Sequence, residues 1–183
     1  MARCSRWTGT SAACRCLDNQ GMPSTMSVLA LRMKRRSGIT FSSGSGKSER
    51  NYVDFLIDGK SLSDHSASLG YDLVSVLARE WIPEERERSV RRLLLAEPAD
   101  FPNNRRSLLV CSECGDLGCG ALSISIGITE GEVTWADFGY QNNYDEKIWA
   151  KGLGELGPFR FDRSQYENAL AGAMTILRGP DES

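Results

Sequence analysis

The sequence predicts an α+β fold, in which an antiparallel sheet packs against a C-terminal helix and a second helix. Two patterns carry this prediction. Apolar and small polar residues alternate along residues 121–128, as in a strand with one buried face. After Asp162, apolar residues recur every three or four positions, as in a helix with one buried face.

The chain of 183 residues is expected to form one domain with a leader and a tail. Residues 1–38 are rich in Ser and Arg and lack a periodic apolar pattern, so we expect a disordered basic leader. Residues 39–178 are expected to form the domain, and residues 179–183 the tail. The first 50 residues contain 9 Lys/Arg against 2 Asp/Glu and the others 13 against 22, so the expected domain is acidic.

The domain is expected to open with two paired strands, residues 39–41 and 52–57, joined by a loop rich in Gly and Ser. Residues 61–69 have an ambiguous pattern that could form a short helical turn, and they include His65, the only histidine. Residues 71–77 are apolar enough to be buried either as a helix or as a strand.

A helix is expected over residues 83–95, because proline is favoured at the first position of a helix and Pro83 stands there. Oppositely charged residues four positions apart, such as Glu84 and Arg88, support it.

The last helix is expected over residues 163–177. Asp162 is a suitable N-cap, and Gln165 three positions later completes a capping-box pattern. Phe161 and Tyr166 have the spacing of a hydrophobic staple across the helix start.

Between these helices we expect an antiparallel meander that contains an unusual turn. Its strands are residues 107–111, 121–128 and 133–138. The first two are joined by a Gly-rich segment that contains Cys111, Cys114 and Cys119.

The cysteine spacing fits a metal site. Two thiolates separated by two residues can bind one tetrahedral zinc ion from a single turn, and Cys119 adds a third sulfur. Zinc would need a fourth ligand. The alternatives are His65, an acidic side chain such as Glu113 or Asp116, water, or a cysteine of the leader.

Two other interpretations of the turn stay open. The cysteines and glycines could simply fill the end of a tight hairpin. Alternatively, the Cys111-x-x-Cys114 thiols could do redox work, although Glu113 and Asp116 nearby would disfavour thiolate formation.

Three spaced motifs resemble the signature of an uncharacterised bacterial family that is frequent in actinobacteria. They are Cys-Gly-Asp-Leu-Gly-Cys-Gly at 114–120, Trp-x-Asp-Phe at 135–138, and Gly-Pro-Phe-x-Phe-Asp-x-x-x-Tyr-Glu at 157–167. Residues 56–62 also resemble the family's opening segment, so the likeness spans about residues 39–177. The resemblance implies a shared fold and transfers no catalytic residue.

The composition favours a small, soluble, cytoplasmic protein. No apolar run reaches the ~18 residues of a membrane span. An acidic domain without clustered Lys/Arg is a poor partner for nucleic acid. We therefore expect a non-catalytic accessory protein that contacts another protein, with a thiol-dependent oxidoreductase or redox sensor as the alternative.

Overall fold

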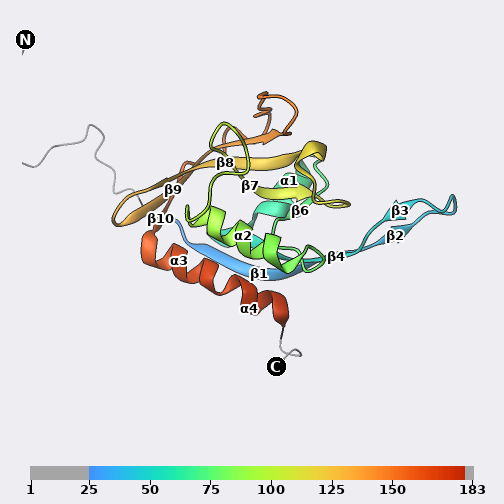
Figure 1. Ribbon diagram of the computed structural model, residues 1–183, viewed down its shortest axis with the longest axis horizontal. Coiled ribbons are helices and arrows are strands. Elements are labelled where there is room, and N and C mark those ends of the chain that lie inside the picture. The colour runs from blue at the N-terminus through green and yellow to red at the C-terminus, as the bar shows by residue number, and fades with distance from the viewer. Residues whose placement is uncertain (1–24, 180–183) are drawn as a thin grey trace, which may run out of the picture.

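Figure 1 shows the computed structural model of the protein, which describes residues 25–179. The strands in this range form two antiparallel sheets and a separate hairpin, with helices against them. The α+β prediction is confirmed, including a C-terminal helical segment and a second helix beside the sheets.

The smaller sheet has the strand order β1-β4-β5. Its strands are β1 (Leu29–Arg36), β4 (Arg50–Ile57) and β5 (Lys60–Ser61). β1 pairs with β4 along its whole length, from Leu29 opposite Ile57 to Arg36 opposite Arg50.

Strand β1 corrects the expected leader boundary, because residues 29–36 were assigned to a disordered leader ending at residue 38. The strand has the alternation of a half-buried strand, with Leu29 fully buried and Leu31 and Met33 packed against the core. The basic residues that suggested a leader lie between and after these apolar ones. Residues 1–24 of the leader and residues 180–183 of the tail lie outside the described residues.

The larger sheet has the order β10-β9-β8-β7-β6 and contains the expected meander. Its strands are β6 (Leu73–Ser75), β7 (Arg106–Cys111), β8 (Ala121–Ile128), β9 (Glu132–Gln141) and β10 (Phe159–Asp162). Residues 71–77 thus form a strand at their centre, which settles the choice left open between helix and strand.

The two sheets are joined at both margins. On one side the Val53 amide of β4 donates to the Leu77 carbonyl oxygen just after β6, at 3.0 Å. On the other side the Ser27 amide just before β1 donates to the Arg160 carbonyl oxygen of β10, at 2.7 Å. The strands of the two sheets therefore surround a hydrophobic core to which both sheets contribute.

Trp135 of β9 lies at the centre of this core. Its ring is fully buried and makes edge-on contacts with Phe55, Phe161 and Tyr166, at centroid distances of 5.8, 5.3 and 5.9 Å. These rings come from both sheets and from the C-terminal helix, so a single aromatic cluster ties the three parts together.

The helices are α1 (Leu62–Ser68), α2 (Pro83–Leu93), α3 (Arg163–Ala171) and α4 (Ala173–Arg178). Helix α2 begins at Pro83 as predicted. The expected helix 163–177 is divided at Gly172, which ends α3 and starts α4. Both parts lie along β1, and α4 also contacts β4 (Figure 1).

The start of α3 fits the prediction in two of three details. The Asp162 side chain accepts from the Gln165 amide at 2.9 Å, and the rings of Phe161 and Tyr166 stack at 5.8 Å. The Gln165 side chain, however, bonds the backbone of Leu29 in β1 instead of returning to Asp162. The return hydrogen bond of a capping box is therefore absent, and the Gln165 side chain instead links β1 to the start of α3.

The segment 39–41 does not pair with β4, which corrects the expected opening of the domain. It forms strand β2 (Ile39–Thr40), which pairs with β3 (Gly46–Lys47) in an exposed hairpin. Figure 1 shows this hairpin projecting away from the sheets.

Candidate metal centre

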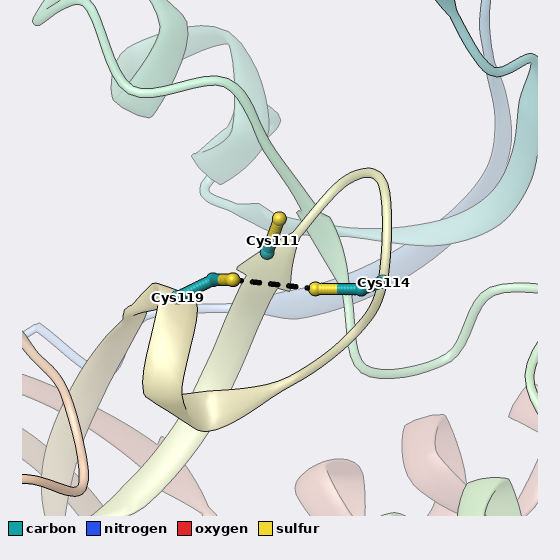
Figure 2. A group of neighbouring side chains, drawn as sticks. All are labelled: Cys111, Cys114 and Cys119. Atoms are coloured by element: carbon teal, nitrogen blue, oxygen red, sulfur yellow. Dashed lines mark hydrogen bonds between the residues drawn. The ribbon is translucent and has the colours of Figure 1, made fainter.

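The three cysteines converge at the turn between β7 and β8, as Figure 2 shows. All three Sγ atoms lie within 4.8 Å of one another, and the Sγ atoms of Cys114 and Cys119 are 3.4 Å apart. Cys111, at the end of β7, is half-buried, and the other two are exposed. The turn thus presents three sulfur atoms to a single point at the surface.

The backbone of the turn needs glycine at two positions. Gly115 has φ +70° and its amide donates to the Cys111 carbonyl oxygen at 2.9 Å, which closes the loop directly behind the Cys-x-x-Cys pair. Gly120 has φ +105° after the short 3-10 helix η1 (Leu117–Cys119). Side chains other than glycine are strained at both of these angles.

Asp116 and Tyr140 hold the second half of the turn. The Asp116 carboxylate accepts from the Gly118 amide and caps η1. The Tyr140 hydroxyl donates to the Cys119 carbonyl oxygen at 2.8 Å, and its ring stacks on Tyr71 at 4.8 Å. Cys119 is therefore positioned through its backbone, which leaves its thiol unconstrained by these contacts.

Arg50 of β4 holds the first half of the turn. Its guanidinium donates to the carbonyl oxygens of Ser112 and Glu113, at 2.8 and 2.7 Å. The same group lies 5.2 Å from the ring centre of Trp81, the side chain that packs against Gly115. Neither residue stands out in the sequence, because each is brought to the turn by pairing between distant segments.

The carboxylate of Glu113 is already occupied. It accepts from the Ser48 amide at 3.1 Å and forms an ion pair with Arg36 at 2.9 Å. These hydrogen bonds from Ser48, together with the Arg36 cation, lower the pKa of the Glu113 carboxyl group against the opposing effect of partial burial. Glu113 and Asp116 thus both have structural partners.

The thiols influence one another strongly. Burial raises the pKa of the Cys111 thiol, but hydrogen bonds from the backbone of Cys114 and Glu113 and from the two other thiols outweigh it, so that the pKa is lowered. The hydrogen bond and the charge of Cys114, followed by the charge of Cys111, raise the pKa of Cys119 to about 11. Three thiolates this close repel one another unless a cation lies between them.

His65 does not join the cysteines, which corrects the expectation that it could be a ligand. It lies on α1, and its Nε2 is 3.4 Å from the Gly152 carbonyl oxygen. The group of converging ligand atoms in residues 25–179 contains the three cysteines without a histidine or a carboxylate. Sequence spacing carried no information on how α1 is placed relative to the turn.

A cavity of about 620 Å³ borders the turn. Cys114, Gly115 and Leu117 form one side of it, and Trp81 and Ile82 contribute apolar surface. The cysteine site is thus open to solvent at the rim of a hollow and is not sealed in the core.

Comparison of the chain with models of protein families, with curated proteins and with solved structures finds no match. The resemblance to the bacterial signature therefore stays a prediction. No helix within residues 25–179 is long and apolar enough to cross a membrane.

Proposed function

We propose that the protein is a non-catalytic accessory protein whose turn at Cys111, Cys114 and Cys119 binds one zinc ion. The observation that carries the proposal is the convergence of three Sγ atoms within 4.8 Å of one another. Sulfur atoms at Zn–S distances of about 2.3 Å from one ion lie less than 5 Å apart, so little movement is needed to bind it.

The electrostatics of the turn support a cation. Deprotonating one thiol raises the cost of deprotonating the next, as the raised pKa of Cys119 illustrates. A divalent ion removes that cost and takes thiolates as its preferred soft ligands. The backbone N–H groups that favour the Cys111 thiolate would remain as partners of a metal-bound sulfur.

Three of the alternatives for the fourth zinc ligand have other partners in the structure. His65 bonds near Gly152, Glu113 is paired with Arg36, and Asp116 caps η1. A water molecule or a ligand from outside the described residues is left for the fourth position. The leader cysteines, Cys4, Cys14 and Cys16, belong to that second group.

A structural rather than catalytic use of the ion fits the surroundings of the turn. Both nearby carboxylates have structural partners, and the single histidine of the chain lies elsewhere. We place the protein in the cytoplasm, where thiols stay reduced, and assign it a protein partner and no nucleic acid. The acidic composition of residues 51–183 supports the last point.

Cobalt(II) titration tests the proposal. Cobalt replaces zinc, and thiolate ligands give it an intense near-ultraviolet charge-transfer band whose strength reports the number of sulfurs. We expect saturation at about one equivalent with three thiolates, and loss of about one third of the band in Cys119→Ser. His65→Ala is the matched control and should leave the spectrum unchanged. A titration without this band, or one that depends on His65, would reject the site.

The short Cys114–Cys119 separation favours one second candidate, a reversible disulfide between these exposed thiols. Its formation transfers two electrons and two protons to an external disulfide, such as oxidised glutathione, which is thereby reduced to two glutathione thiols. Equilibration of the metal-free protein with glutathione redox buffers, followed by mass analysis, tests it. Loss of 2 Da in the wild type but not in Cys114→Ser would support the couple. If the thiols of Cys114 and Cys119 both stay free in oxidising buffer, the disulfide is rejected.

A further inference from the structure

A second pocket, unrelated to the cysteine turn, lies where the end of α4 meets the start of α2. Its volume is about 290 Å³. Its lining is positively charged because it includes three arginines: Arg79, Arg86 and Arg178. The other lining residues are Pro83, Glu87, Met174 and Leu177.

These three arginines have no ion-pair partner among the described residues. Their neighbours on α2 do: Arg88 and Arg92 pair with Glu85 at 3.2 and 2.6 Å, and Arg91 pairs with Glu97 at 3.1 Å. Glu87, the only acid in the pocket lining, lies 3.8 Å from Arg91. The arginines of the pocket therefore keep positive charge without a paired carboxylate, whereas the other arginines of α2 are paired with glutamates.

Two of the guanidinium groups are held in place by backbone. Arg79 donates through Nε and Nη2 to the Leu177 carbonyl oxygen, at 3.0 and 2.7 Å. Arg86 donates through Nη1 to the Arg79 carbonyl oxygen at 2.9 Å. Carbonyl acceptors fix the orientation of these cations without neutralising them, and the other N–H groups stay available.

The Nε atom of Arg86 is buried without a hydrogen-bond partner. Buried polar groups are rarely left unpaired, and each exception calls for a ligand, a water or a strain. The Arg86 side chain is otherwise half-buried, and the exposed Arg79 and Arg178 line the same pocket. An anion in the pocket would offset the three positive charges and supply an acceptor for the Arg86 Nε.

We propose that this pocket binds a small phosphorylated anion. Phosphate carries up to two charges and three acceptor oxygens, and guanidinium groups bind such oxygens in pairs. A single carboxylate would leave one of the three arginines unsatisfied. The volume is sufficient for a phosphate or pyrophosphate group with a small substituent.

Calorimetric titration with inorganic phosphate and with pyrophosphate tests this site. We expect one equivalent of pyrophosphate to bind to the wild type, more tightly than phosphate. The double variant Arg86→Gln with Arg178→Gln should weaken pyrophosphate binding at least about tenfold, since each lost charge-assisted hydrogen bond contributes ~1.5 kcal/mol or more. The double variant Arg88→Gln with Arg163→Gln, which removes the same number of positive charges outside the pocket, should change the affinity less than twofold.

Three results would overturn the proposal. The first is pyrophosphate affinity that is equal in the wild type and in a double variant shown by circular dichroism to be folded. The second is equal weakening by the double variant Arg88→Gln with Arg163→Gln, which would indicate binding to net charge alone. The third is binding only after Asp181→Asn and Glu182→Gln, which would assign the pocket to the chain's own acidic tail.

Discussion

Arg50 of β4 donates to the Glu113 carbonyl oxygen at 2.7 Å and so fixes the cysteine turn from a strand 63 positions away. The same guanidinium also donates to the Ser112 carbonyl oxygen and lies over the Trp81 ring. A single cation thus sets the position of the two residues between Cys111 and Cys114. The geometry of the thiols depends on this contact and not on the local sequence alone.

Arg50→Gln should therefore weaken metal binding without touching a ligand. Loss of a group that orients metal ligands typically costs 10- to 100-fold in affinity, and we expect about tenfold here. Competition with a chromogenic zinc chelator measures the change. Arg88→Gln, which removes an exposed arginine on α2, should have no effect, and an equal loss in that control would mean that charge alone matters.

Gly120→Ala should disrupt the turn. At φ +105° an added Cβ would overlap the Tyr140 hydroxyl, the group that holds the Cys119 carbonyl oxygen. We expect a loss of about 2 kcal/mol or more in unfolding free energy, together with weaker cobalt binding. Gly127→Ala within β8 meets open space and should change stability by less than about 1 kcal/mol. Urea unfolding compares the two, and equal effects would refute the steric argument.

Tyr166→Phe should destabilise the protein only through the loss of two buried hydrogen bonds. The buried hydroxyl donates to the Leu93 carbonyl oxygen at 2.8 Å and accepts from the Trp135 indole at 3.2 Å. Its removal leaves both partners unsatisfied, at a cost of about 2 kcal/mol. Tyr144→Phe is the matched control, since Tyr144 is 83% exposed, and should cost less than about 0.5 kcal/mol. Similar melting temperatures for the two variants would contradict this account of the core.

Acid should weaken the link between β1 and the hairpin. Asp72 accepts from Arg36 and Lys47, and these contacts, Arg36 first, lower its pKa from 3.8 to about 2. Because the folded pKa is the lower one, the stabilisation is complete above about pH 4 and is lost as the pH falls toward 2. Asp72 is partly exposed, so the effect is modest.

Asp72→Asn should accordingly lower stability at pH 6 and flatten its decline between pH 4 and pH 2. Denaturant midpoints across that range measure both. Asp145→Asn in an exposed loop provides the comparison and should reproduce the wild-type curve. If Asp72→Asn retains the full wild-type acid dependence, the ion pairs of Asp72 make no contribution to it.

Local signals predicted the elements that depend on local physics. Pro83 placed the start of α2, Asp162 placed the start of α3, and alternation revealed β8. The signal for β1 was also present in Leu29, Leu31 and Met33, but the arginines around them dominated the interpretation. The break at Gly172 was not foreseen, because the apolar stripe continues across it.

Contacts between segments that are distant in the sequence could not be predicted from it. The spacing of Cys111, Cys114 and Cys119 predicted a shared site, since one short turn contains them all. Whether His65 would join them depended on the placement of α1, which no spacing encodes. Arg50 likewise gave no sign of its contact with the turn, because that contact follows from long-range strand pairing.

The zinc content of the protein purified without chelator tests the central claim most directly. We expect about one equivalent of zinc by elemental analysis and a lower melting temperature after its removal. Zinc added back should restore the melting temperature in the wild type but not in Cys111→Ser. A metal-free preparation whose melting temperature does not change on addition of zinc would contradict the claim.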